Sequence, residues 1–307
     1  MQPFFSVIIS LYNKEKHIAA TLQSVLDQNF SNFEIIIVND GSTDSSLSII
    51  SGFKDQRISI YSQENSGASN TRNNGISKAN GQFIALLDGD DLWESSYLDE
   101  MYNTIAMFQD QAVFASAIAH KIENKIVPSQ YASLPSKTVN VLNFFQYSLK
   151  QSLLSGSSTV FKKEILEVTG QFDPSIKSGQ DTDLWIRIGL HYPIVFINKV
   201  LVYYVYSSSS LSNTSFNMSD KPKYLNYTEA EKKNNDLKKF LDINRYAMAL
   251  KSKIYKDCDS FSFYKKHIDE SNLSLNKQIL LQSPRWLLLL LLSFKSLKRQ
   301  KLYYKPL

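Results

Sequence analysis

Residues 83–93 read Phe-Ile-Ala-Leu-Leu-Asp-Gly-Asp-Asp-Leu-Trp, an apolar run followed at once by an acidic turn. Five consecutive apolar residues are too few for a helix and are typical of a strand that is buried on both faces. In an open α/β sheet, ligands bind beyond the carboxyl ends of the strands. We therefore predict that the acidic residues after this strand lie at a ligand site.

The acidic turn has the Asp-x-Asp (DXD) pattern of a metal-diphosphate site. Asp88 and Asp90 are two residues apart, so their side chains point the same way in extended chain, and Gly89 permits a sharp turn or a close approach to a ligand. Two adjacent carboxylates repel each other. Mg²⁺ or Mn²⁺ removes this conflict and keeps coordination positions for phosphate oxygens and water. The alternative, an acidic turn that caps the next helix, suits Asp91, because its spacing to Glu94 is that of a capping box.

The composition is that of a globular protein, with 307 residues of which 43% are hydrophobic and 21% charged. This length allows one large α/β domain and an appendage. The single cysteine, Cys258, excludes an internal disulfide framework, and the four histidines lack zinc-site spacing. We expect a cytoplasmic protein without a signal peptide, because the first residues lack a basic region.

Positive charge is concentrated at the end of the chain. Residues 271–307 contain no acid and seven basic residues, namely Lys277, Arg285, Lys295, Lys298, Arg299, Lys301 and Lys305. Because the whole chain has a net charge of +5, the 270 residues before this segment carry −2. This distribution argues against a nucleic-acid-binding body and for an anionic surface at one end of the molecule.

Strands and helices alternate through the first ninety residues or so, which predicts a mostly parallel sheet covered on both faces. The predicted strands are 4–11, 33–38, 57–62 and 83–87, with helices beginning near 18, 44 and 65. Further along we predict helices over 94–109, 140–154 and 162–169, a helix entered at 178–185, and strands over 112–119, 126–127, 159–161, 194–197 and 201–206. The glycine motifs of dinucleotide-binding and P-loop proteins do not occur in the sequence, so these classes lose their usual signatures.

The chain divides into three predicted regions. Residues 1–215 form the α/β domain, and a charge-rich helical subdomain follows over residues 216–282. Residues 283–307 form a basic amphipathic tail helix that begins at Ser283-Pro284.

Several segments, in this order, resemble the family 2 glycosyltransferases. The segments are Ser6-Val-Ile-Ile-Ser-Leu-Tyr-Asn13, Phe33-Glu-Ile-Ile-Ile-Val-Asn-Asp-Gly-Ser-Thr-Asp44, Asn70-Thr-Arg-Asn-Asn-Gly75, Leu87-Asp-Gly-Asp-Asp91, Gly170-Gln-Phe-Asp173 and Gly179-Gln-Asp-Thr-Asp-Leu-Trp185. The resemblance covers residues 5–212 approximately. It implies the Rossmann-like GT-A fold that binds nucleotide sugars, followed here by a C-terminal helical appendage.

The resemblance implies a donor pocket at the ends of the first strands. Asp40 would hydrogen-bond the nucleotide base, Tyr12 and Asn13 would line the same pocket, and Arg72 would lie beside the diphosphate. From the residues alone, Asp40 lies beyond a strand, as a ligand residue should, although it could serve only to form the turn that follows. Arg72 is a fixed cation that suits a diphosphate, although it could also form an ordinary surface salt bridge.

By the same resemblance, Asp90 is the main metal ligand, Asp88 contacts ribose or metal, and Asp181 is the catalytic base of an inverting enzyme. Relatives usually have an acid before this base, where the chain has Gln180. Asp181 could instead be an acid that stabilises a helix N-terminus, but a glycine-flanked acid leading a helix favours the base. Trp185 would serve the acceptor site or pack in the core.

One feature departs from the family pattern. Many relatives have a histidine after the last core strand that helps to hold the metal, whereas here residues 203–206 (Tyr-Tyr-Val-Tyr) lead into a run of serines. We therefore expect weaker metal binding, a metal shell completed by water, or lower activity.

The tail contains the apolar run Trp286–Leu292 and basic residues beyond it. About nine apolar residues extend roughly 14 Å as a helix, half of the ~30 Å hydrocarbon thickness of a membrane, so this helix cannot span one. We predict a helix that lies in the membrane interface. The alternative is a short buried helix or a dimer contact.

Taken together, these features predict an inverting, metal-dependent glycosyltransferase that uses Mn²⁺ or Mg²⁺. It would transfer a sugar from a nucleotide sugar, taken to be a UDP-sugar, to a saccharide or lipid-linked acceptor during surface polysaccharide assembly. Its expected place is the inner face of the cytoplasmic membrane, and the sequence is compatible with an oligomer. The alternatives are a nucleotide-sugar-binding scaffold protein without activity and a nucleotidyltransferase, which also uses paired aspartates and a metal.

Overall fold

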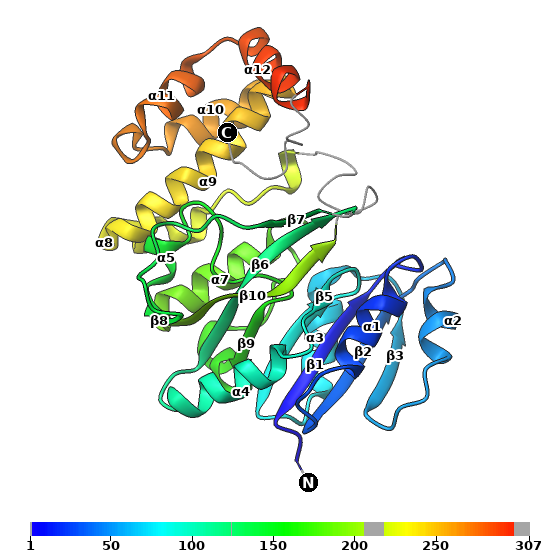
Figure 1. Cartoon of the computed structure of the whole chain (residues 1–307). Helices are drawn as coiled ribbons and strands as arrows, with labels where there is room; N and C mark the ends of the chain where they lie inside the picture. The colour runs from blue at the N-terminus through cyan, green and yellow to red at the C-terminus, as the bar shows by residue number, and fades with distance from the viewer. Residues whose placement is uncertain (1, 124, 206–217, 298–307) are drawn as a thin grey trace.

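The computed structural model describes residues 2–123, 125–205 and 218–297 (Figure 1). The strands of the described residues are β1 Phe5–Leu11, β2 Phe33–Asp40, β3 Ile58–Gln63, β4 Phe83–Asp88, β5 Leu92–Trp93, β6 Val113–Ile122, β7 Lys125–Pro128, β8 Val139–Leu142, β9 Thr159–Lys162 and β10 Ile194–Val205. They form a single mixed sheet in the order β3-β2-β1-β4-β9-β6-β10-β5, with β7 paired to β6 and β8 paired to β10.

The helices lie on both faces of this sheet and beyond one end of it (Figure 1). The α-helices of the described residues are α1 Ile18–Leu26, α2 Ser46–Ser51, α3 Ala68–Lys78, α4 Tyr97–Met107, α5 Phe144–Tyr147, α6 Leu166–Thr169, α7 Gln180–His191, α8 Thr228–Lys233, α9 Asn235–Ile254, α10 Cys258–Lys266, α11 Leu275–Gln282 and α12 Arg285–Leu297. This arrangement confirms the predicted α/β fold with a C-terminal helical appendage.

Strands β3, β2, β1 and β4 are all parallel, as predicted from the strand-helix alternation. Their registers place Asp88 beside Ser10 and Asp40 beside Gln63. Because the carboxyl ends of these strands meet at one edge, the acidic residues that follow them are brought together there. The remaining strands are mixed, with β9 antiparallel to both β4 and β6.

Alternating residues of the central strands feed two cores, one on each face of the sheet. Val7 and Ile9 of β1 pack with α1 and α4, whereas Ile8 packs on the opposite side with Ile76 of α3 and with α5, α7 and α9. Each core residue named here is at most 1% exposed. The apolar runs of the first half are therefore explained by burial on both faces of a sheet.

The prediction of one helix over residues 140–154 is wrong. Residues Val139–Leu142 form β8, which pairs antiparallel with β10, and only Phe144–Tyr147 are helical. Asn143 separates the two elements, because its side chain accepts a hydrogen bond from the amide of Gln146 at 3.1 Å and so caps the short helix. Pairing with β10 decides the structure here, since the same apolar residues fit a helix or an alternating strand.

The capping role considered for Asp91 is also wrong. Residues Leu92–Trp93 form β5, which pairs with β10, and α4 begins at Tyr97 with Ser96 as its N-cap residue. The strands predicted over 194–197 and 201–206 form one strand, β10, whose pairing with β6 is irregular between Ile197 and Val202. The predicted break corresponds to this irregularity.

The C-terminal helices are joined to the α/β core through α9. Leu237, Phe240 and Leu241 in its first half pack in the core that contains α5 and α7, and Tyr246 and Leu250 in its second half pack in a separate cluster with α10, α11 and α12. The predicted boundary near Ser215 lies outside the described residues. Within the described residues, no helix combines the length and apolar character needed to cross a bilayer.

Candidate active site

The centre of the site is Arg72 of α3, which binds two aspartates that are far apart in the sequence. Its Nη2 lies 2.7 Å from Asp88 Oδ1 at the end of β4, and its Nη1 lies 2.8 Å from Asp181 Oδ1 at the start of α7. The guanidinium is buried, and burial alone would lower its pKa, but the two carboxylates raise the pKa of Arg72 above its ordinary value. Arg72 is thus a permanent cation between two acids, and not a surface salt bridge.

Asp181 is the second residue of α7, and the N-cap residue is Gly179 with φ of +89°. A side chain at Gly179 would lie 3.0 Å from Pro222, so glycine suits both the backbone conformation and the space. Burial raises the pKa of Asp181 above the usual carboxyl value, while Arg72 acts in the opposite direction. Asp181 is therefore an acid of the first turn of α7 and not its N-cap residue, and it is paired with Arg72. Its role as catalytic base stays a prediction.

A loop that follows α6 holds Arg72 in place. The carboxamide of Asn73 donates to the Phe172 carbonyl at 2.8 Å and accepts from the Phe172 amide at 3.1 Å, while the Phe172 ring lies 5.2 Å below the Arg72 guanidinium carbon. The Ser69 hydroxyl adds a bond to the Asp173 carbonyl at 3.0 Å. Sequence reasoning missed this support, and its one signal was the segment Gly170-Gln-Phe-Asp173.

The loop before β9 packs against the acidic turn at very short range. A side chain at Gly156 would lie 2.8 Å from Asp88 Oδ2 and 3.2 Å from Arg72 Nη2. The Ser157 hydroxyl accepts from the Asp88 amide at 3.1 Å and donates to Asp91 Oδ2 at 2.6 Å. Gly156 and Ser157 are positioning residues that sequence reasoning treated only as a loop.

Asp91 belongs to this support and not to a helix cap. Its side chain is buried, and besides Ser157 it accepts from the Val205 amide at 3.2 Å. Burial, together with the charges of Asp90 and Asp88, raises the pKa of Asp91 well above its usual range. Asp91 therefore joins the end of β4 to the end of β10.

Asp90 is paired with an ammonium group. Lys14, just beyond β1, forms a short ion pair with Asp90 Oδ2, and its backbone amide donates to the Ser46 hydroxyl at 2.8 Å. A side chain at Gly89 would lie 3.1 Å from the Ser10 carbonyl and 3.5 Å from Lys14 Cγ. Gly89 thus allows the turn to approach β1 and Lys14, a contact that sequence reasoning missed.

Asp88 and Asp90 have the chemistry of a site for Mg²⁺ or Mn²⁺. Within the described residues no three His, Cys, Asp or Glu side chains cluster as a protein-only metal site. Such an ion usually takes one or two carboxylates and completes its shell with substrate phosphates and water, so two acids suffice. Both acids are paired with cations in this structure, Asp88 with Arg72 and Asp90 with Lys14, so their mutual repulsion is already offset. The metal at this turn stays a prediction. The serine run predicted to replace the family histidine lies outside the described residues.

Asp40 is buried at the end of β2. Its carboxylate accepts from the Gln63 side chain at 2.8 Å, the Ser66 amide at 2.9 Å and the Gly67 amide at 3.0 Å. These bonds fix the loop that opens α3, so Asp40 orients the helix that carries Arg72. The contact with a nucleotide base stays a prediction.

Asn13 and Tyr12 lie at the same edge. Asn13 has φ of +50°, and its side-chain oxygen accepts from the Thr43 amide at 2.8 Å, which ties the end of β1 to the loop after β2. Tyr12 is 42% exposed, and its contact with a nucleotide stays a prediction. Both predicted donor-site residues therefore lie near Asp40.

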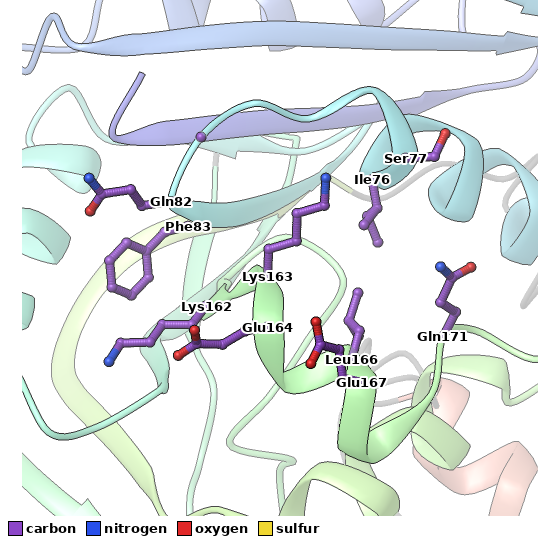
Figure 2. Close-up of a pocket in the computed structure, with 11 residues that line it drawn as sticks. Ile76, Ser77, Gln82, Phe83, Lys162, Lys163, Glu164, Leu166, Glu167 and Gln171 are labelled. Carbon is purple, nitrogen blue, oxygen red and sulfur yellow. The ribbon is translucent and has the colours of Figure 1, made fainter. Parts of the chain in front are cut away.

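Two cavities lined by described residues are relevant to the site. The larger, of about 680 Å³, lies at the amino end of β4, between α3 and the segment from β9 to α6 (Figure 2). Figure 2 shows side chains of Ile76, Lys163 and Glu167 around it; among the described residues, none of the predicted site residues lines it. The smaller, of about 300 Å³, is lined by Asp181 and Trp185. Trp185 is only 3% exposed and packs against Phe172, so it is a core residue and also a wall of this cavity.

Comparison with known proteins gives a consistent result. Residues 6–170 match the family model described as glycosyl transferase family 2. An uncharacterized glycosyltransferase of Rickettsia conorii is 35% identical over 201 residues, which are 64% of this chain and 32% of the relative. GlyA, a glycosyltransferase of Streptococcus pneumoniae, is 31% identical over 218 residues, which are 67% of this chain and 31% of GlyA. The chain thus spans about a third of the length of these two relatives.

A shorter relative matches over most of its length. TuaG, a Bacillus subtilis glycosyltransferase provisionally assigned to teichuronic acid biosynthesis, is 28% identical over 75% of this chain and 90% of TuaG. Among solved structures, Staphylococcus aureus TarS superposes with a TM-score of 0.66 at 20% identity, covering 89% of this chain and half of TarS. A complex of TarS residues 1–349 with UDP-GlcNAc gives a TM-score of 0.61 at 19% identity, over 92% of this chain and 78% of that chain. These superpositions confirm the GT-A fold.

Proposed function

The chain belongs to glycosyl transferase family 2, and on this basis we propose that it is an inverting enzyme that moves a sugar from a UDP-sugar to a saccharide hydroxyl. The observation that carries the proposal is the bridge of Arg72 between Asp88 and Asp181. The two acids bind different nitrogens of one guanidinium, and this supports assigning Asp88 to the diphosphate and Asp181 to proton abstraction. Membership of this family sets the nucleotidyltransferase alternative aside.

In the proposed reaction, Asp181 takes the proton of the acceptor hydroxyl. At the same time the oxygen of this hydroxyl attacks the anomeric carbon of the donor. The bond between that carbon and the diphosphate oxygen breaks, and UDP leaves with the bonding electrons. Arg72 stabilises the negative charge that develops on the departing diphosphate. A divalent ion held by Asp88 and Asp90 would neutralise the same charge. Attack from the face opposite the leaving group inverts the anomeric configuration.

The donor and acceptor classes rest on the relatives. TarS is solved with UDP and with UDP-GlcNAc, and TuaG is named for teichuronic acid biosynthesis. We therefore propose a UDP-sugar donor and a role in surface polysaccharide assembly. The direct test is to incubate the protein with a panel of nucleotide sugars and Mn²⁺ and to measure hydrolysis and transfer by mass spectrometry. Turnover of no nucleotide sugar, by protein that is folded, would contradict the proposal.

The metal proposal predicts that UDP binds more tightly when Mn²⁺ is present. Replacing Asp90 with asparagine should abolish this difference, because an amide cannot neutralise the ion. Replacing Lys14 with methionine should increase the gain in UDP affinity caused by Mn²⁺ by about tenfold, because the ammonium that competes for Asp90 is removed. A tenfold change corresponds to only ~1.4 kcal/mol. Calorimetry with and without Mn²⁺ measures both effects.

The matched control is Asp110→Asn, which removes an exposed acid from the turn after α4. This variant should show the Mn²⁺ dependence of the parent protein. Equal affinity of the parent for UDP with and without Mn²⁺ would refute the metal assignment to Asp88 and Asp90.

We further propose that α12 places the enzyme on an anionic membrane surface. Trp286, Leu290 and Phe294 are spaced four residues apart on one face of the helix and are 66%, 44% and 56% exposed, whereas Leu288 is buried against α9 and its neighbours. The buried-helix alternative therefore describes one face of α12 only. The chain supplies seven basic residues after position 270 and no acid, and each is worth about 1 kcal/mol near anionic lipids.

The triple variant Trp286→Gln, Leu290→Gln, Phe294→Gln should lose most co-sedimentation with phosphatidylserine-containing vesicles and keep its affinity for UDP. The parent should bind less at high salt, because screening weakens the basic contribution. A matched control replaces the exposed apolar residues Met107, Ile126 and Val168, which are 65%, 55% and 58% exposed, with glutamine. Equal vesicle binding by the parent and the α12 variant would reject the membrane surface.

A further inference from the structure

The cavity of about 300 Å³ beside Asp181 has a wall that comes from the C-terminal helices and not from the family 2 region. Phe240, Ile243, Asn244 and Ala247 of α9 line it. Their spacing of three and four residues places them on one face of the helix. One face of α9 therefore forms a wall of the cavity that Asp181 also lines.

The other walls combine apolar surface with a few polar groups. Trp185, Phe144 and Tyr204 supply aromatic surface, and Asp181 and Ser152 supply polar atoms. The Ser152 hydroxyl is buried and has no hydrogen-bond partner among the described residues. Aromatic surface with a few convergent polar groups suits a sugar ring, which has an apolar face and a rim of hydroxyls.

Asn244 is the polar residue on the wall that α9 provides. Its amide nitrogen donates to the Phe240 carbonyl of the same helix at 2.8 Å, which fixes the side chain. The carboxamide oxygen has no partner among the described residues and can accept a bond from a ligand. Asn244 is only partly buried, so its oxygen is accessible to a ligand that enters the cavity.

The cavity adjoins the predicted donor site, but the aspartates predicted for the donor and the metal do not line it. Of the described residues, neither Asp88, Asp90 nor Asp40 lines the cavity. Gly156 lines the cavity, and a side chain on it would lie 2.8 Å from Asp88 Oδ2, so the cavity and the acidic turn are neighbours across this loop. A hydroxyl in the cavity would thus lie beside Asp181, the acid to which we assign proton abstraction.

We propose that this cavity is the acceptor subsite, that it holds one pyranose ring, and that the Phe240–Ala247 face of α9 determines which acceptor is used. The size agrees, because about 300 Å³ is the lower end of the range for ligand pockets and too small for a longer oligosaccharide. This inference rests on the proposed function, and it assigns acceptor selection to a helix outside the residues that define the family.

The experiment measures binding of a panel of p-nitrophenyl pyranosides to the full chain in the presence of UDP, by saturation-transfer NMR and titration. Ala247→Trp fills the cavity from α9 and should weaken binding of any glycoside that the parent accepts by about tenfold or more, or ~1.4 kcal/mol. Asn244→Ala, a smaller change, should weaken it by about three- to tenfold, the usual range for one hydrogen bond. UDP affinity should stay within about twofold of the parent, because neither residue faces the donor side.

Asn235→Ala is the matched control, since Asn235 is an exposed asparagine at the start of the same helix. It should bind glycosides and UDP like the parent. Glycoside binding that is equal in the parent and both cavity variants would overturn the inference, as would a parent that binds UDP but no glycoside. Failure of the parent to bind UDP would instead refute the proposed function.

Discussion

Replacing Asp181 with asparagine is expected to slow sugar transfer by about two orders of magnitude or more and to leave UDP affinity near that of the parent. Asparagine keeps the shape of the side chain and an oxygen that can accept from Arg72, but it cannot take a proton. The loss should therefore appear in the chemical step. Initial rates of transfer, together with UDP titration of the same preparation, measure both quantities.

Asp183→Asn is the matched control for this experiment. Asp183 lies two residues further along α7, but its carboxylate binds Arg187 at 2.7 Å and the Tyr227 hydroxyl at 2.5 Å, and so supports the fold. The folded fraction of this variant should retain transfer within a few fold. Retention of transfer by Asp181→Asn to the same degree would mean that Asp181 only holds Arg72, and that the base lies elsewhere.

The parallel half of the sheet could be predicted because each of its signals is local. The apolar runs of β1, β2 and β4 are continuous, as burial on both faces requires, and short connections force each next strand to lie nearby. The position of the acids after these strands then follows from the sheet, because parallel strands end at one edge. Asp40 and Asp88 were found in this way without any knowledge of their contacts.

The residues that support the site could not be found in this way, since their roles depend on contacts between distant segments. Asn73 and Phe172 are 99 residues apart, and Lys14 and Asp90 are 76 apart. Asn73 lies in the segment Asn70–Gly75 that resembles the family, but nothing in this segment indicates that its side chain contacts Phe172. Asp91 shows the same limit, because its spacing to Glu94 fits a capping box, yet pairing of Leu92–Trp93 with β10 converts the segment into a strand.

Arg245→Met is expected to destabilise the C-terminal helices by about 3–5 kcal/mol, the usual cost of leaving a buried acid without its partner. Arg245 is fully buried, and its two terminal nitrogens bind the Glu231 carboxylate at 2.6 and 2.9 Å. Nη1 also lies 3.4 Å from Asp242, which is itself fully buried, and Lys238 pairs with the same two acids. The charges of two basic and two acidic side chains thus cancel within this cluster.

This cluster joins α8 to α9 and reaches beyond α10. The Asp242 carboxylate accepts from the Asn272 side chain at 2.8 Å, and Arg245 donates to the His267 carbonyl at 3.3 Å. Because α9 carries both the wall of the acceptor subsite and the attachment of α12, disruption of the cluster should impair glycoside binding and vesicle binding together. Binding of UDP should change less, since the donor side is built from the parallel half of the sheet.

A double-mutant cycle separates charge from packing in this prediction. If the main penalty of Arg245→Met is the unpaired acid, adding Glu231→Gln should recover part of the lost stability, because the interior is neutral again with Lys238 and Asp242. Urea unfolding followed by circular dichroism measures the difference. If the double variant is less stable than Arg245→Met by the full cost of Glu231→Gln alone, the two residues do not interact, and the guanidinium stabilises the helices through its packing instead.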